Sequence, residues 1–160
     1  MTTTTHSSGK MPKPIPTESQ PQDAIAVLTE EHEQVKAMFE QYEELGDRAH
    51  VSKHKLALQI CEALTQHARK EEEIFYPAVR QAIKEDDLMD EALVEHASAK
   101  DLIAQIQSME PGDDLFEAKV KVLSEMIEHH VEEEEGEMFP KVRKSGLDLE
   151  ELAEQMEQST

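Results

Sequence analysis

Four stretches of the chain repeat apolar residues at alternating steps of three and four positions. This spacing is typical of an α-helix that buries one face in a bundle. It predicts an all-α protein with helices over about 23–45, 52–84, 87–109 and 114–139. The stripes read Ile25, Leu28, His32, Val35, Phe39 and Tyr42; then Ile60, Leu64, His67, Glu71, Ile74 and Ala78; then Ala92, His96, Ala99, Ile103 and Ile106; and finally Phe116, Val120, Leu123, Ile127, His130 and Glu134.

Prolines mark the expected limits of these helices. Pro111 and Gly112 follow the third helix, and Pro140 should end the fourth. Pro77 lies inside the second helix, which it should kink or interrupt because proline has no amide hydrogen.

The chain divides into three parts on these grounds. Residues 1–22 are rich in Thr, Ser and Pro and predict a disordered tail. The bundle domain spans 23–142. Residues 143–160 form a C-terminal tail with a short amphipathic helix.

One pattern of residues occurs twice. The segment 67–77 aligns with 130–140, with a histidine, two consecutive glutamates and a proline in register. In the same way the dipeptide Glu31-His32 aligns with Glu95-His96. A helix pair that is used twice predicts a bundle with approximate twofold symmetry.

Composition narrows the possible partners. Charged residues make up 32% of the 160 residues, and the formal net charge is −20. Such a chain should repel phosphate backbones and anionic lipids, so we expect neither nucleic acid nor a membrane as partner. The single cysteine, Cys61, excludes an intramolecular disulfide. No apolar stretch approaches the roughly 20 residues that span a bilayer, and we expect a cytoplasmic protein.

Six polar residues occupy the stripes that should be apolar. They are His32, His67, Glu71, His96, His130 and Glu134. A buried ionised carboxylate must be paired, protonated or bound to a cation, because an unpaired charge in a core is very costly. No arginine or lysine lies on the stripes. A metal cluster accounts for all six positions together.

The spacing supports metal binding. His67 and Glu71 are four residues apart, as are His130 and Glu134, so each pair leaves the same face of its helix. Histidine and glutamate suit iron, manganese or zinc, and six ligands suit two ions better than one structural zinc. Taken singly, a histidine on such a stripe is more often a core residue and a glutamate run is more often a solvated face. The repeated set favours ligands.

These residues resemble a known family, the hemerythrin-like or HHE cation-binding domains. The resemblance covers about 24–142 and rests on Leu28-Thr-Glu-Glu-His32, His67-xxx-Glu71-Glu-xx-Phe-Tyr-Pro77, Glu95-His96 and His130-xxx-Glu134 ending in Met-Phe-Pro140. It implies an up-down-up-down four-helix bundle with two iron ions, in preference to manganese or zinc. It further implies that the four histidines bind terminally and the two glutamates bridge.

Two departures from oxygen-carrying hemerythrins matter. Those proteins have a second histidine four residues after the third-helix histidine, where this chain has Lys100. Their last motif also has an aspartate five residues after its histidine, which leaves Glu134 and Glu135 as alternatives here. The internal repeat favours Glu134. The missing histidine argues against simple reversible oxygen carriage and implies a more open centre.

Three functions remain open from the sequence. The first is a di-iron centre that binds or senses oxygen, nitric oxide or a related small ligand. The second is a di-iron enzyme that decomposes peroxide, so the sequence does not decide whether the protein is an enzyme. The third is a bundle whose metal is purely structural.

Overall fold

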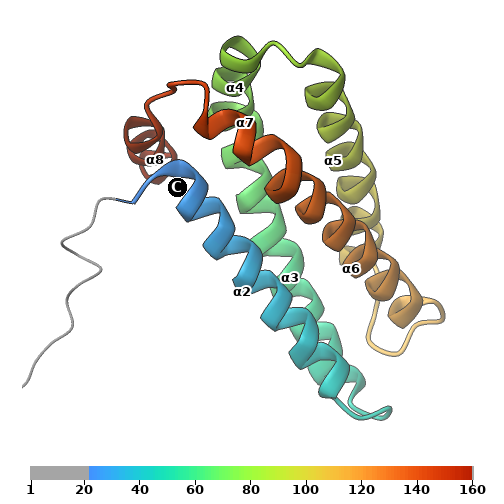
Figure 1. Cartoon of the computed structure of the whole chain (residues 1–160). Coiled ribbons are helices and arrows are strands. Elements are labelled where there is room, and N and C mark those ends of the chain that lie inside the picture. The colour runs from blue at the N-terminus through green and yellow to red at the C-terminus, as the bar shows by residue number, and fades with distance from the viewer. Residues whose placement is uncertain (1–21, 160) are drawn as a thin grey trace, which may run out of the picture.

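The computed structural model describes residues 22–159, which are helical with no strand among them (Figure 1). The expected disordered tail lies outside this part of the chain apart from residue 22. The elements in chain order are α2 (Ala24–Glu44), α3 (His50–Lys70), the π-helical turn η1 (Glu71–Phe75), α4 (Tyr76–Ile83), α5 (Asp86–Gln107), α6 (Phe116–Glu133), the π-helical turn η2 (Glu134–Met138), α7 (Phe139–Arg143) and α8 (Leu149–Gln158).

The long helices pack into a helical bundle (Figure 1). α2 packs against α3, α5 packs against α6, and α3 also contacts α5. The side chain of Asp23 caps the start of α2 by accepting a hydrogen bond from the amide of Ala26 at 2.8 Å. The short helix expected near the C-terminus is α8, which packs against α2 and η1. The division into three parts stays a prediction.

Two π-helical turns interrupt the long helices and explain how the chain tolerates its prolines. In η1 the amide of Tyr76 donates to the carbonyl of Glu71, and in η2 the amide of Phe139 donates to the carbonyl of Glu134. Each proline then lies in the first turn of the next α-helix, where no amide hydrogen is required. The expected interruption near Pro77 is confirmed. The expected helix end before Pro140 is wrong, because the chain continues as α7.

Each π-helical turn also shifts the buried stripe by one residue. The sequence predicted Ile74 and Ala78 as buried after Glu71, but both are only half-buried. Phe75 and Val79 are buried instead, because the wider turn contains one extra residue. Of the other stripe positions, Ala99 and Ile127 are also half-buried.

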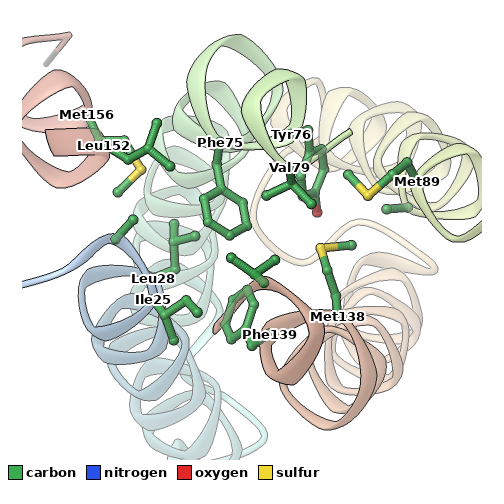
Figure 2. Packing of buried hydrophobic residues seen from close by; sticks show 13 residues of the cluster. Ile25, Leu28, Phe75, Tyr76, Val79, Met89, Met138, Phe139, Leu152 and Met156 are labelled. Carbon is green, nitrogen blue, oxygen red and sulfur yellow. The ribbon is translucent and has the colours of Figure 1, made fainter. Parts of the chain in front are cut away.

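Two apolar clusters form the core. Cluster A comprises Ala24, Ile25, Leu28, Phe75, Tyr76, Val79, Met89, Ala92, Met138, Phe139, Val142, Leu152 and Met156 (Figure 2). Cluster B comprises Val35, Phe39, Tyr42, Ala57, Ile60, Cys61, Leu64, Ile103, Ile106, Phe116, Val120 and Leu123. Along each long helix, the buried histidine lies between residues of the two clusters. The predicted polar positions therefore form a layer between two apolar regions.

Within residues 22–159, no helix combines the length and the apolar character that a membrane span requires.

Candidate metal centre

All six predicted site residues are buried in the layer between the clusters. Their exposed fractions are 7% for His32, 9% for His67, 0% for Glu71, 7% for His96, 8% for His130 and 1% for Glu134. The structure brings them together as two overlapping groups whose ligand atoms lie within 4.8 Å of one another, one with His32, His67 and both glutamates, the other with Glu71, His96 and His130.

The first group is made by His32 and His67. Nε2 of His32 lies 3.2 Å from Oε1 of Glu134, and Nε2 of His67 lies 3.3 Å from Oε2 of Glu71. None of these four buried atoms has a hydrogen-bond partner among the described residues. Four converging donors without a hydrogen-bond partner fit a bound cation, since buried polar atoms are otherwise nearly always paired.

The second group is made by His96 and His130. Nε2 of His96 lies 3.0 Å from Oε1 of Glu71, and Nε2 of His130 lies 3.4 Å from Oε2 of Glu134. The two oxygens of each glutamate thus face different histidine pairs. This arrangement would allow both carboxylates to contact two ions at once.

Tyr76 joins the second group, although the sequence did not single it out. Its hydroxyl oxygen lies 3.1 Å from Oε1 of Glu71 and 3.2 Å from Nε2 of both His96 and His130, and it also donates to Glu134. The ring belongs to cluster A (Figure 2), whereas the hydroxyl group contacts the histidines of the polar layer. The second group therefore has one oxygen donor that the first group lacks.

A second set of carboxylates surrounds the histidines. Nδ1 of each histidine contacts one glutamate oxygen, at 2.7 Å for His32 and Glu135, 2.7 Å for His67 and Glu31, 2.6 Å for His96 and Glu72, and 2.6 Å for His130 and Glu95. Because an ionised carboxylate only accepts hydrogen bonds, Nδ1 must carry the proton in every case. Nε2 is thus the atom that each histidine offers to the centre. Such outer carboxylates hold metal-binding histidines in orientation.

These contacts bear on the two departures noted in the sequence. Glu134 lies in the polar layer, whereas Glu135 lies outside it against His32. The side chain of Lys100 is 54% exposed, and its ammonium group donates to Glu72. Lys70 donates to Glu31 in a similar way, at 2.5 Å.

Comparison with known proteins identifies the family. Residues 23–142 match the family described as the hemerythrin HHE cation binding domain. The chain belongs to this family. The resemblance drawn from the sequence is confirmed, and this HHE domain carries a histidine and glutamate cluster able to bind metal.

Two relatives illustrate the likeness. The HHE domain is 26% identical to a solved hemerythrin HHE cation binding domain-containing protein from Mycobacterium kansasii, with a TM-score of 0.72 and coverage of 86% of this chain and 85% of the other. It is also 31% identical over 117 residues to a DNA nickase from Nostoc sp. strain PCC 7120. That match covers 73% of this chain but 32% of the nickase, so the chain spans about a third of this relative.

The carboxylates change the acid–base behaviour of the histidines. Burial alone would lower the pKa of His67, but Glu71 and Glu31 raise it to about 10. Burial alone would also lower the pKa of His130, but the neighbouring Glu134 carboxylate raises it to about 10. Conversely, burial pushes the pKa of Glu71 upward, yet His67 holds it well below its usual range. The raised pKa favours a second proton on Nε2 of His67 and His130 in the metal-free HHE domain, and a metal ion that binds there must displace it.

A cavity of about 220 Å³ adjoins the centre. All four histidines line it, and its remaining wall is mostly apolar, with Leu64, Ala68, Ala99, Ile103 and Ile127 among the lining residues. The cavity gives a small ligand room next to the metal-binding atoms.

The sequence contained signals for the outer carboxylates, although it did not assign them the role of orienting the histidines. Glu31 and Glu95 directly precede the aligned histidines, and Glu72 and Glu135 directly follow the aligned glutamates. Each of these glutamates is repeated in register, but glutamates on a helix are usually exposed to solvent, so the repeat alone does not reveal their contacts with the histidines. Tyr76 had no such signal, because the aligned residue is Phe139.

Proposed function

We propose that this HHE domain holds a non-heme di-iron centre that binds or senses oxygen, nitric oxide or a related small ligand. The observation that carries the proposal is the pair of converging donor groups, which share Glu71 and are also linked by Glu134, whose Oε2 lies 3.4 Å from Nε2 of His130. The first group supplies two histidine nitrogens and two carboxylate oxygens, and the second supplies two histidine nitrogens and an oxygen of Glu71 beside Oε2 of Glu134, donor sets that suit iron. His32, His67, His96 and His130 would bind terminally, and Glu71 and Glu134 would bridge.

The finer architecture belongs to the same proposal. We infer an up-down-up-down four-helix bundle built from a helix pair used twice. Matching contacts support it: Glu31 bonds His67 as Glu95 bonds His130, and a π-helical turn follows in both halves.

We also assign Tyr76 as a ligand of the second ion. Its hydroxyl oxygen lies within 3.2 Å of both histidine nitrogens in the second group. A phenolate is a hard anionic donor, which favours a trivalent iron over zinc. The two ions would then be inequivalent, with the first held by four protein atoms and the second by five.

Open coordination positions would be the site of ligand binding. Iron accepts more ligands than the four atoms of the first group, and the adjoining cavity is large enough for a diatomic molecule or peroxide. When bound, the ions would supply Lewis acidity and redox chemistry toward that ligand. The protein's own residues hold the ions, fix the imidazole protons and exclude bulk water.

Peroxide decomposition is the second candidate. Tyr76 in its protonated, unbound form favours it, because a phenol that contacts both glutamates could exchange a proton with a ligand at the centre. Rapid oxygen release from peroxide would support catalysis, whereas a stable nitric oxide adduct with slow turnover would support sensing.

Partners follow from charge. We propose neither nucleic acid nor a membrane as partner, because the net charge of −20 repels both. The activity named for the Nostoc relative is not carried over, since the match covers a third of that protein. Cytoplasmic location stays a prediction.

Metal content and the ultraviolet–visible spectrum of protein purified under air test the proposal. The wild type should contain about two irons per chain and show ligand-to-metal charge-transfer bands. Glu71→Ala with Glu134→Ala should lose both. The matched control is Glu73→Ala with Glu137→Ala, which removes two exposed carboxylates from the same π-helical turns and should keep both irons. A wild type with one metal or none would contradict the proposal.

A further inference from the structure

A second histidine–glutamate pair lies on α6, one residue before the pair of the buried centre. His129 and Glu133 are four residues apart, as His130 and Glu134 are, but they are rotated by about 100° toward the surface. Nε2 of His129 lies 3.3 Å from Oε2 of Glu133 and 3.6 Å from Oε2 of Glu95 on α5. The donor atoms of these three residues lie within 4.8 Å of one another.

The sequence repeat shows what stands at this place in the other half. It aligns Lys70 with Glu133 and Gln66 with His129. In the first half, one oxygen of Glu31 accepts from Nδ1 of His67 and the other accepts from the ammonium group of Lys70 at 2.5 Å.

The second half has Glu95 in place of Glu31, but this carboxylate has no lysine as its neighbour among the described residues. Oε1 of Glu95 accepts from Nδ1 of His130 at 2.6 Å, and Oε2 faces His129 and Glu133. A fixed cation is therefore replaced by an imidazole and a further carboxylate. Two carboxylates and an imidazole that converge in this way provide a donor set that can hold a divalent cation.

We infer that Glu95, His129 and Glu133 bind one divalent cation at the surface, in the charge-neutralising place that Lys70 fills beside Glu31. One nitrogen and carboxylate oxygens suit Fe²⁺, Mn²⁺ or Zn²⁺. The side chain of His129 is 63% exposed, so water completes the coordination and the ion exchanges with solvent. The site is separate from the buried centre and does not depend on which metal fills that centre.

One carboxylate links the surface group to a histidine of the buried centre. Glu95 contacts His130 with one oxygen and the surface group with the other. Glu95 and His129 also line the cavity beside the buried histidines. A surface cation would therefore lie one side chain away from the buried centre.

Binding of Mn²⁺ to protein whose buried centre already holds zinc tests the inference. Metal analysis before the titration shows whether the buried centre is filled, so a failure there is recognised separately. Electron paramagnetic resonance then follows free Mn²⁺. The wild type should bind one Mn²⁺ per chain, and spin-echo spectra of the bound ion should show modulation from one imidazole nitrogen.

Two variants separate a built site from general attraction to an acidic surface. His129→Gln copies Gln66 and should weaken Mn²⁺ binding at least tenfold and abolish the nitrogen modulation. Glu132→Lys makes a comparable charge change to Glu133→Lys at an exposed neighbour and should leave the modulation intact. His129→Gln with Glu133→Lys restores the residues of the first half and should bind no surface Mn²⁺. Equal Mn²⁺ binding by the wild type and this double variant would overturn the inference.

Discussion

Tyr76 places its hydroxyl oxygen 3.2 Å from Nε2 of His130, which lies 54 positions further along the chain. The residue aligned with Tyr76 in the other half is Phe139, whose ring stacks on His32 with a centroid distance of 6.1 Å. One histidine of each pair thus contacts an aromatic ring, His32 with Phe139 and His96 with Tyr76, but only the ring of Tyr76 carries an oxygen. In the proposed di-iron centre, this single oxygen atom would make the two metal positions chemically different.

Tyr76→Phe is the direct test of this difference. The variant keeps the ring in cluster A and copies the residue that the chain already uses at 139. We expect two irons still to bind, but the phenolate-to-iron charge-transfer band in the visible spectrum to disappear. Resonance Raman spectra should lose the phenolate ring modes at the same time.

Tyr42→Phe is the matched control for Tyr76→Phe. Tyr42 is also a buried tyrosine, but it belongs to cluster B, away from the candidate ligands. Its removal should leave the visible spectrum unchanged. A spectrum of Tyr76→Phe that equals the wild-type spectrum would mean that Tyr76 is not a ligand.

The metal-free protein should become less stable as pH rises from about 6.5 to 10. The pKa of both His67 and His130 is raised from 6.5 to about 10 in the folded state. The native state therefore binds more protons than the unfolded state in this window. The resulting stabilisation is complete below pH 6.5 and is lost as pH passes through 10.

Thermal unfolding at several pH values measures this effect. The Tm of the metal-free protein should fall by at least several degrees across the window. The metal-loaded protein should lack this loss, because metal replaces the Nε2 protons. A Tm of the metal-free protein that is flat or rises between pH 6.5 and 10 would show that the histidines are already neutral.

Glu135 should control metal affinity without being a ligand. It accepts from Nδ1 of His32 at 2.7 Å, and removal of such an outer partner commonly costs about 10- to 100-fold in metal affinity. We expect Glu135→Ala to weaken iron binding within this range in a chelator competition. Glu132→Ala, an exposed glutamate on the neighbouring turn, should have little effect. Equal iron affinity in the two variants would show that Glu135 does not support metal binding through His32.

The cavity beside the centre should govern how fast a ligand arrives. Ala99 lines it from α5, so Ala99→Leu should fill part of its volume and slow nitric oxide binding to the reduced protein in stopped-flow measurements. Metal content should not change. Ala104→Leu adds the same atoms to an exposed position of α5 and serves as the control. Identical binding rates in the two variants would mean that ligands reach the centre by another route.

The helices were predictable because their apolar periodicity is long and regular. The π-helical turns were not, since one extra residue inside a helix leaves no periodic signal beyond the nearby proline. This is why Ile74 and Ala78 were expected to be buried in place of Phe75 and Val79. Periodicity shows that a helix exists, but it does not show a local change in the number of residues per turn.

The six candidate ligands were found because a charged group on a buried stripe requires a partner. The rest of the site was harder to see, as the run from Glu132 to Glu135 illustrates. Glu132 is exposed, Glu133 faces His129, Glu134 lies in the polar layer and Glu135 contacts His32. Four identical residues in a row occupy four environments, and composition alone cannot distinguish them.

Because each π-helical turn depends on one extra residue, the number of residues in the turn should matter more for the fold than the identity of its exposed residues. In η2 a Cβ added to Gly136 meets no atom within 4 Å, and its backbone has no positive φ. Gly136→Ala should therefore be tolerated or slightly stabilising in thermal unfolding, by up to about 1 kcal/mol. Deletion of the same residue would shorten the segment between Glu134 and Phe139 and place Pro140 inside a regular α-helix. Homologous chains should accordingly vary in sequence at this position yet resist the loss of a residue there.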